Sequence, residues 1–177
     1  KFIKDLDELQ QMVGATLDYM RGLAEGGEAV QPIDVTALIS SLKEDAEEAA
    51  HAVTVSGNAR RPVMGRAQAL KRCLQNLIDN ALNYGQRADI VLRDDGGSVS
   101  ICVADRGPGI PEGEIERVFD PFYRVEGSRN RNTGGSGLGL AIARNIAQAH
   151  GGSVTLRNRA QGGLEATLTL PCETSGS

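Results

Sequence analysis

Hydrophobic residues, with one threonine among them, recur through the first 25 positions at alternating intervals of four and three residues. The recurring positions are Phe2, Leu6, Leu9, Val13, Thr16, Met20 and Leu23. This heptad spacing predicts a helix over residues 1–25, and Ile3, Met12 and Leu17 widen its apolar stripe, which favours a bundle. One stripe cannot bury itself, so we expect its partner to be a second copy or sequence outside this chain. The alternative is a helix that packs back onto its own domain.

Glycine and proline residues separate this first helix from the rest of the chain. Residues 26–33 begin with two glycines and read as a linker. Asp34 is a candidate N-cap for a second helix, which the apolar spacing carries to near Val53. We therefore expect one larger domain at residues 34–172, followed by a flexible tail at 173–177.

The pattern within the larger domain alternates helices with strands. Helices are predicted at 67–84 and 137–150, with a short one around 112–118. Strands are predicted at 53–56, 61–64, 88–94, 98–104, 153–158 and 164–170. The first two strands could pair with each other, and the last four form two hairpins. Residues 120–136 lack periodicity and read as a mobile loop. Mostly antiparallel strands with helices on one face predict an α+β sandwich.

Composition narrows the class of protein. The chain has 177 residues, 40 % hydrophobic and 24 % charged, with a net charge of −4, so it offers no basic face for nucleic acid. It contains no apolar run of membrane-spanning length, and we expect no membrane contact from these residues. Three cysteines without CxxC spacing read as free thiols in a reducing cytosol. Two histidines exclude a histidine-rich metal site. A start at Lys1 within a helical pattern suggests a fragment.

Three asparagines share one stripe of the helix predicted at 67–84. Asn76, Asn80 and Asn83 fall within about 60° of one another, away from the apolar face. Their amides supply both acceptors and donors, and a carbonyl oxygen suits Mg²⁺ when phosphates complete its coordination. A merely solvated polar stripe is the alternative.

Two glycine-containing segments follow. Asp105-Arg-Gly107-Pro-Gly109-Ile110-Pro leaves a strand and turns sharply, which places a carboxylate where an adenine amino group could donate to it. The segment 134–140 leads into a helix, and its backbone N–H groups and helix dipole suit phosphate. It matches neither a Walker loop nor the dinucleotide fingerprint. A plain turn is the alternative for the first segment.

Arginines gather in the loop between these segments. The positive charges of this loop are Arg124, Arg129 and Arg131, opposed only by Glu126. Guanidinium groups bind polyphosphate well through charge-assisted hydrogen bonds. A solvated loop is the alternative interpretation.

Taken in order, these segments resemble the N, G1, F and G2 boxes of sensor histidine kinases. The boxes are Asn76 to Tyr84, Asp105 to Gly109, Phe119-Asp-Pro-Phe122-Tyr-Arg124, and Gly135-Ser-Gly137-Leu-Gly139-Leu140. Residues 162–171 look like the terminal strand box. The resemblance covers about residues 34–171, and the helix at 1–25 resembles the second helix of the dimerisation and phosphoacceptor hairpin.

The resemblance implies a Bergerat-type ATP-binding sandwich with ATP and Mg²⁺ as ligands. It implies that Asn80 is the main Mg²⁺ ligand with Asn76 assisting, and that Asp105 binds the adenine amino group beside Tyr84. Arg124 and Arg129 would reach the phosphates, Phe119 and Phe122 would anchor the lid, and the glycines of the last box would wrap the triphosphate. The family often has a basic residue where Asn83 stands. The full implied nucleotide-binding set also contains Gly107, Gly109, Ile110, Gly135, Ser136, Gly137, Leu138, Gly139, Leu140 and Thr167.

The resemblance also implies a reaction and partners. The chain would give the ATP γ-phosphate to a histidine on a dimerisation helix, for onward transfer to a response-regulator receiver domain. The parent would be a homodimer through the first helix and an inner-membrane-anchored bacterial sensor, with this part cytoplasmic. Neither His51 nor His150 stands in a phosphoacceptor motif, so we expect ATP binding without autophosphorylation.

Two alternatives compete with the histidine kinase, and the first is an ATPase or serine kinase of the same fold. Hydrolytic relatives place a glutamate general base where Asn76 stands, and an amide cannot take that proton, so we expect very slow hydrolysis. A non-catalytic nucleotide-binding or dimerisation module of the same fold is the other alternative.

Overall fold

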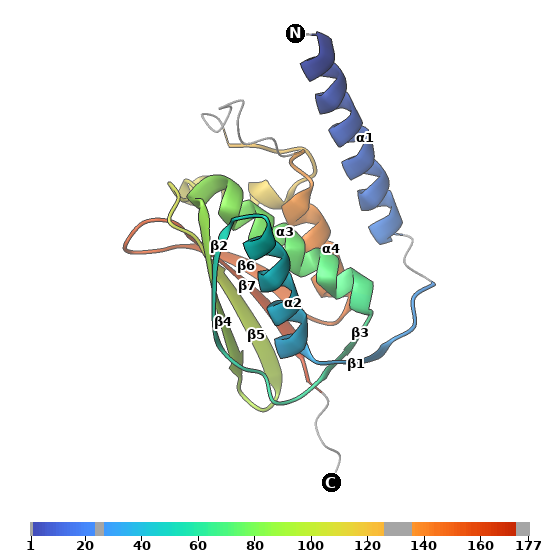
Figure 1. Ribbon diagram of the computed structural model, residues 1–177, viewed down its shortest axis with the longest axis vertical. Coiled ribbons are helices and arrows are strands. Elements are labelled where there is room, and N and C mark those ends of the chain that lie inside the picture. The colour runs from blue at the N-terminus through green and yellow to red at the C-terminus, as the bar shows by residue number, and fades with distance from the viewer. Residues whose placement is uncertain (1, 24–26, 126–135, 173–177) are drawn as a thin grey trace.

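The computed structural model describes residues 2–23, 27–125 and 136–172 (Figure 1). Its helices are α1 (Phe2–Leu23), α2 (Val35–Glu48), α3 (Ala67–Gly85) and α4 (Gly139–Ala149), with 3₁₀ turns η1 (Glu112–Glu114) and η2 (Arg117–Phe119). Its strands are β1 (Gln31–Ile33), β2 (Ala52–Gly57), β3 (Val63–Gly65), β4 (Arg87–Asp94), β5 (Ser98–Ala104), β6 (Ser153–Asn158) and β7 (Leu164–Pro171). The α+β prediction is confirmed.

Five strands form one mixed sheet in the order β2-β4-β5-β7-β6. Only the β2–β4 pair is parallel, and the two predicted hairpins, β4–β5 and β6–β7, are both antiparallel. Helices α2, α3 and α4 cover one face of this sheet (Figure 1). The alternation of buried and more exposed residues along β4, β5 and β7 shows that every second side chain enters the core beneath these helices.

The predicted pairing of 53–56 with 61–64 is wrong. Strand β2 pairs with β4, with Val53 opposite Ala88, whereas β3 pairs with β1 in a separate two-stranded sheet. The segment expected to be a linker, 26–33, therefore contributes a strand. Short apolar runs give no information about which strand they pair with.

The predicted N-cap of α2 is confirmed, but its end is not. Asp34 Oδ1 accepts a hydrogen bond from the Ala37 N–H at 3.0 Å. The helix stops at Glu48, and Ala50 takes a positive φ of 60° that turns the chain into β2. The helix expected around 112–118 is likewise two separate 3₁₀ turns.

The apolar stripe of α1 remains largely exposed. Phe2, Leu9 and Val13 are each more than half exposed, while Ala15 and Tyr19 pack partly against the core. Contacts between α1 and α4 show that this helix touches its own domain without burying its heptad stripe (Figure 1). Among the described helices, none is both long and apolar enough to cross a bilayer.

All three cysteines are free thiols, as predicted. Cys73 is fully buried, and this burial raises the pKa of its thiol to about 12. A thiol that stays protonated in the core has a packing role and little reactivity.

The N-terminus of α3 is capped from a distance. Its N-cap residue, Arg66, makes no side-chain cap, and the carboxylate of Glu28 instead accepts from the N–H groups of Gln68 at 2.7 Å and Ala69 at 3.3 Å. The Arg66 N–H is bound at 3.0 Å by His150 Nε2 at the end of α4. These contacts fasten the segment before β1 to the helix that carries the asparagine stripe.

We expect Glu28→Ala to lower the free energy of unfolding by about 0.5–2 kcal/mol, because two helix N–H groups lose their acceptor. Glu28→Gln keeps an acceptor and loses less. Urea denaturation measures both, with Glu44→Ala on the exposed side of α2 as the control. A loss for Glu28→Ala no larger than that of the control would contradict the cap.

Candidate functional site

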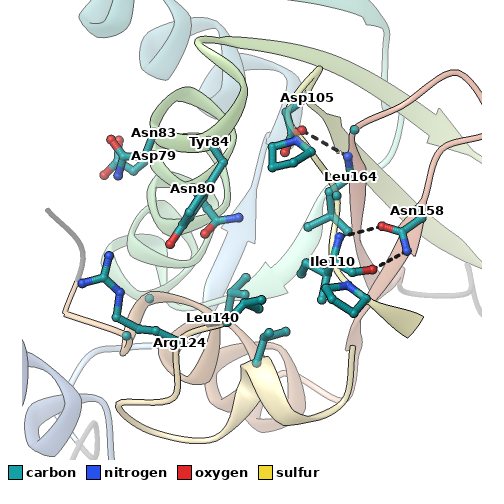
Figure 2. A pocket seen from close by; sticks show the side chains of 18 of the residues that line it. Asp79, Asn80, Asn83, Tyr84, Asp105, Ile110, Arg124, Leu140, Asn158 and Leu164 are labelled. Atoms are coloured by element: carbon teal, nitrogen blue, oxygen red, sulfur yellow. Dashed lines mark hydrogen bonds between the residues drawn. The ribbon is translucent and has the colours of Figure 1, made fainter. Parts of the chain in front are cut away.

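A cavity of about 800 Å³ lies between α3, the loop after β5, the N-terminus of α4 and the β6–β7 turn (Figure 2). Most of the predicted site residues that are described line it, and these are Asn76, Asn80, Asn83, Tyr84, Asp105, Gly109, Ile110, Arg124, Ser136, Gly137, Gly139 and Leu140. Segments far apart in the sequence thus meet at one cavity.

The asparagine stripe of α3 forms one wall. Asn80 and Tyr84 project from the helix toward the loop that carries Ile110, whereas Asp79 and Asn83 point to the other side of the helix (Figure 2). The Nδ2 atom of Asn76 is buried and has no hydrogen-bond partner among the described residues. An unsatisfied buried donor is costly, and a ligand oxygen in the cavity would satisfy it.

Asp105 forms the opposite end of the cavity. It is the one buried charged residue in the described part of the chain, at 3 % exposure. Its Oδ1 accepts hydrogen bonds from the N–H groups of Gly107 at 2.8 Å and Leu164 at 3.1 Å. None of the described residues donates to Oδ2, so this oxygen is available to a donor in the cavity.

Close backbone contacts hold this end in place. A Cβ on Gly163, whose φ is +96°, would lie 2.1 Å from the Asp105 carbonyl oxygen, and a Cβ on Gly85 would lie 2.6 Å from the Asp105 Cβ. Only glycine at these two positions allows the β6–β7 turn and the end of α3 to approach Asp105 so closely.

The N-terminus of α4 bounds the third side. The Gly137 carbonyl accepts a hydrogen bond from the Phe122 N–H at 3.0 Å, and a Cβ on Gly137 would lie 2.9 Å from the Phe122 backbone. Phe122 therefore anchors the loop through its main chain, while its side chain is 52 % exposed. Phe119 is buried and lies under the Arg144 guanidinium, 4.2 Å from its ring centre.

Several predicted residues do not line the cavity. Gly107 packs against the end of α3, Leu138 and Phe119 are buried in the core, and the Phe122 side chain is exposed. Thr167 follows Ala166 on β7 and lies on the opposite face of the sheet, paired with Cys102. Arg129 and Gly135, like most of the loop predicted at 120–136, lie outside the described residues.

Other lining residues were not in the predicted set: Asp79, Pro108, Pro111, Val118, Tyr123, Val125, Asn158, Arg159, Gly162, Gly163 and Leu164. Some were detectable, because Asp79 lies on the asparagine helix and Gly162-Gly163 begins the last box. Asn158 and Arg159 carry no sequence signal, since their place at the cavity depends on how the last hairpin packs.

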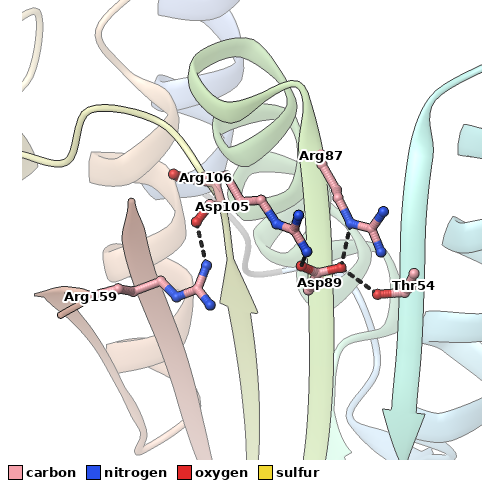
Figure 3. Close-up of polar contacts among 6 residues, drawn as sticks. All are labelled: Thr54, Arg87, Asp89, Asp105, Arg106 and Arg159. Carbon is pink, nitrogen blue, oxygen red and sulfur yellow. Dashed lines mark hydrogen bonds and ion pairs between the residues drawn. The ribbon is translucent and has the colours of Figure 1, made fainter. Parts of the chain in front are cut away.

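A polar network on the outer face of the sheet supports the base of the same loop (Figure 3). The Asp89 carboxylate accepts from the Thr54 hydroxyl at 2.6 Å and the Arg87 Nε at 2.8 Å, and Arg106 approaches it to 3.8 Å. Burial acts to raise the pKa of the Asp89 carboxyl, but the hydrogen bonds from Thr54 and Arg87 and the two positive charges outweigh it and lower this pKa.

The geometry defines a nucleotide-sized site in an α/β sandwich, and comparison with known proteins identifies it further. A family model described as histidine kinase-, DNA gyrase B-, and HSP90-like ATPase matches residues 65–174. The chain therefore belongs to this family. It is an ATP-binding catalytic domain of the sensor histidine kinase type.

The relatives match nearly the whole chain. The sensor histidine kinase GtrS of Pseudomonas aeruginosa is 44 % identical over 97 % of this chain and 35 % of its own length. The sensor-like histidine kinase SenX3 of Mycolicibacterium smegmatis is 33 % identical over 97 % of this chain and 47 % of its own length. Full-length ShkA, crystallised with AMPPNP, covers 97 % of this chain with a TM-score of 0.75 and 25 % identity, across 37 % of the ShkA chain. The chain thus spans less than half the length of these relatives.

We expect Asp89→Asn to lower the free energy of unfolding at pH 7 by about 0.5–1 kcal/mol. The pKa of Asp89 is lower in the folded chain, so its stabilisation is present above the unfolded pKa and is lost as pH falls through the folded value. The difference between wild type and variant therefore shrinks toward pH 3 in urea titrations, and Glu44→Gln on the exposed side of α2 is the control. A difference for Asp89→Asn that stays the same from pH 7 to pH 3 would contradict the network.

Proposed function

We propose that this chain donates the ATP γ-phosphate to a histidine on a dimerisation helix outside it, for onward transfer to an aspartate of a response-regulator receiver domain. The observation that carries the proposal is the buried Nδ2 atom of Asn76, which has no hydrogen-bond partner among the described residues and lies next to Asn80 on a cavity wall opposite Asp105. This arrangement offers polar groups to both ends of a nucleotide.

Asp105 recognises the base in this proposal. Its Oδ2 accepts from the exocyclic amino group of adenine, while the bonds to Gly107 and Leu164 hold the carboxylate in place. Tyr84, half-buried one helical turn after Asn80, packs beside the base or ribose.

The asparagines serve the phosphate end. The described residues contain no cluster of three or more His, Cys, Asp or Glu that could hold a metal ion, so a cation here depends on amide oxygens and phosphates. Mg²⁺ suits such a set, with Asn80 as its main protein ligand, and it would neutralise phosphate charge. Asn76 donates to a phosphate oxygen, and Arg124 with Arg129 of the lid adds positive charge. Asn83 is neutral, so it offers no charge contact.

Among the described residues that line the cavity, none is placed to act as a general base for water. Of the two carboxylates that line it, Asp105 lies at the base end and Asp79 points away from Asn80 (Figure 2). Asn76 cannot accept a proton. Bound ATP is then stable until an imidazole arrives, and transfer depends on positioning and charge neutralisation.

The exposed heptad stripe of α1 supports the assembly proposed for the parent. More than half of each of Phe2, Leu9 and Val13 is accessible, as expected of one helix of a dimeric bundle. Because the relatives are sensor histidine kinases, we place this part on the cytoplasmic side of a membrane-anchored bacterial sensor.

We expect Asn80→Ala to weaken binding of Mg²⁺ with a non-hydrolysable ATP analogue about tenfold or more, equivalent to about 1.4 kcal/mol. Without Mg²⁺, the variant and wild type should differ little, since the lost oxygen acts through the cation. Isothermal titration with and without EDTA measures this. Asn58→Ala, an exposed asparagine distant from the cavity, is the control. An equal loss of affinity with and without Mg²⁺ would show that Asn80 does not act through the metal ion. Absence of any heat of binding by wild type would favour a non-catalytic module.

We expect no phosphohistidine on this chain alone and ATP hydrolysis well below about 1 s⁻¹. His150 is already bound on both ring nitrogens, by the Arg66 N–H at 3.0 Å and the Ile146 carbonyl at 2.7 Å. Mass spectrometry after incubation with Mg-ATP measures phosphorylation of both histidines. A dimerisation hairpin from a related kinase, added in trans, is the positive control. Phosphate on His51 or His150, or rapid hydrolysis, would count against the proposal.

A further inference from the structure

The loop that carries Asp105 is held by the β6–β7 turn through a side chain outside every predicted motif. Asn158, the last residue of β6, accepts a hydrogen bond from the Ile110 N–H at 2.9 Å and donates to the Ile110 carbonyl at 2.6 Å (Figure 2). Its Nδ2 also donates to the Glu112 carboxylate at 2.9 Å. Binding both groups of one residue fixes the loop in position and in rotation, as a neighbouring strand would.

The next residue holds the other end of the loop. The Arg159 guanidinium donates to the Asp105 carbonyl at 2.7 Å (Figure 3). On the same turn, Leu164 exchanges bonds with Asp105: its carbonyl accepts the Asp105 N–H at 2.9 Å, and its N–H donates to Oδ1 at 3.1 Å. The β6–β7 turn therefore contacts the loop at its start, Asp105, and near its end, Ile110.

Glycine at 109 provides the space for this contact. A Cβ at Gly109 would lie 2.6 Å from Asn158 Oδ1, and the φ of this residue is +73°. The second glycine of the loop thus serves the docking of Asn158 as well as the sharp turn itself. Asn158 and Arg159 also line the cavity, so the contact forms part of its wall.

We propose that Asn158 is a positioning residue for base recognition, which with Arg159 sets where the Asp105 carboxylate and Ile110 meet the base. The inference rests on the proposed contact of Asp105 with the adenine amino group. A hydrogen bond to a carboxylate discriminates only if the carboxylate is held still, because a mobile one can accept from water or turn away. Removing the Asn158 hydrogen bonds to Ile110 then reduces selectivity for the base more than affinity for the phosphates.

The test compares ADP with inosine diphosphate, which has a carbonyl oxygen in place of the amino group. Isothermal titration of the 177-residue wild-type chain with Mg²⁺ should show ADP favoured about 10-fold or more, as expected for a charge-assisted hydrogen bond. For Asn158→Ala we expect this ratio to fall to about threefold or less. Arg157→Ala is the matched control, because this neighbouring side chain is exposed and pairs with Glu165 away from the cavity.

The ratio of the ADP affinity to the inosine diphosphate affinity distinguishes a loss of loop positioning from a loss of protein stability. Loss of folded protein lowers the apparent affinity for both nucleotides equally, so an unchanged ratio in Asn158→Ala would overturn the inference while leaving the proposed function intact. If wild type itself binds the two nucleotides equally, the role of Asp105 fails and the inference fails with it. If Asn158→Ala does not fold, Arg159→Ala removes only the bond to the Asp105 carbonyl and is expected to lower the ratio in the same direction, and an unchanged ratio there would overturn the inference.

Discussion

Burial of the apolar face of α3 against the sheet is the constraint on which the site depends. Leu70, Leu74, Leu77 and Ile78 are almost fully buried, so the helix cannot rotate without exposing them. With that face fixed, the helical period directs Asn76 and Asn80 into the cavity. The same packing brings the end of α3 against the loop after β5. One hydrophobic contact therefore sets the distance between the amides and the carboxylate.

The two ends of the cavity are built by different physical means. The wall on α3 is rigid because a packed helix carries it, and its buried Asn76 Nδ2 has no hydrogen-bond partner among the described residues. The end of the cavity that carries Asp105 is a loop, and a loop needs hydrogen bonds to hold its shape. Here Leu164, Asn158 and Arg159 supply them from a single turn. The shape of this loop thus depends on a hairpin that comes 53 residues after Asp105 in the chain, counted to Asn158.

The sequence predicted long periodic elements and failed at short ones. The helix expected at 67–84 and the hairpin at 88–104 formed as expected, because each is specified by its own apolar period and by a glycine-containing turn. The strands at 53–56 and 61–64 were found, but their partners were not, since strands of six and three residues have few side chains with which to specify a partner. Most of the candidate site lay in recognisable motifs. Thr167 shows the limit, because its motif was recognised while the face it occupies was not predicted.

The sequence by itself determined the fold class, the stripe of amides, the carboxylate at the end of a strand and the glycine-led helix, because each is encoded by local spacing. Tertiary structure alone decided that Glu28 caps α3, that β3 pairs with β1 in the segment before α2, and that Asn158 and Arg159 reach the loop after β5. These contacts join residues 30 or more positions apart, for example Ile33 with Val63 and Glu28 with Gln68. Their partners are selected by how the packed layers meet, which no local pattern records.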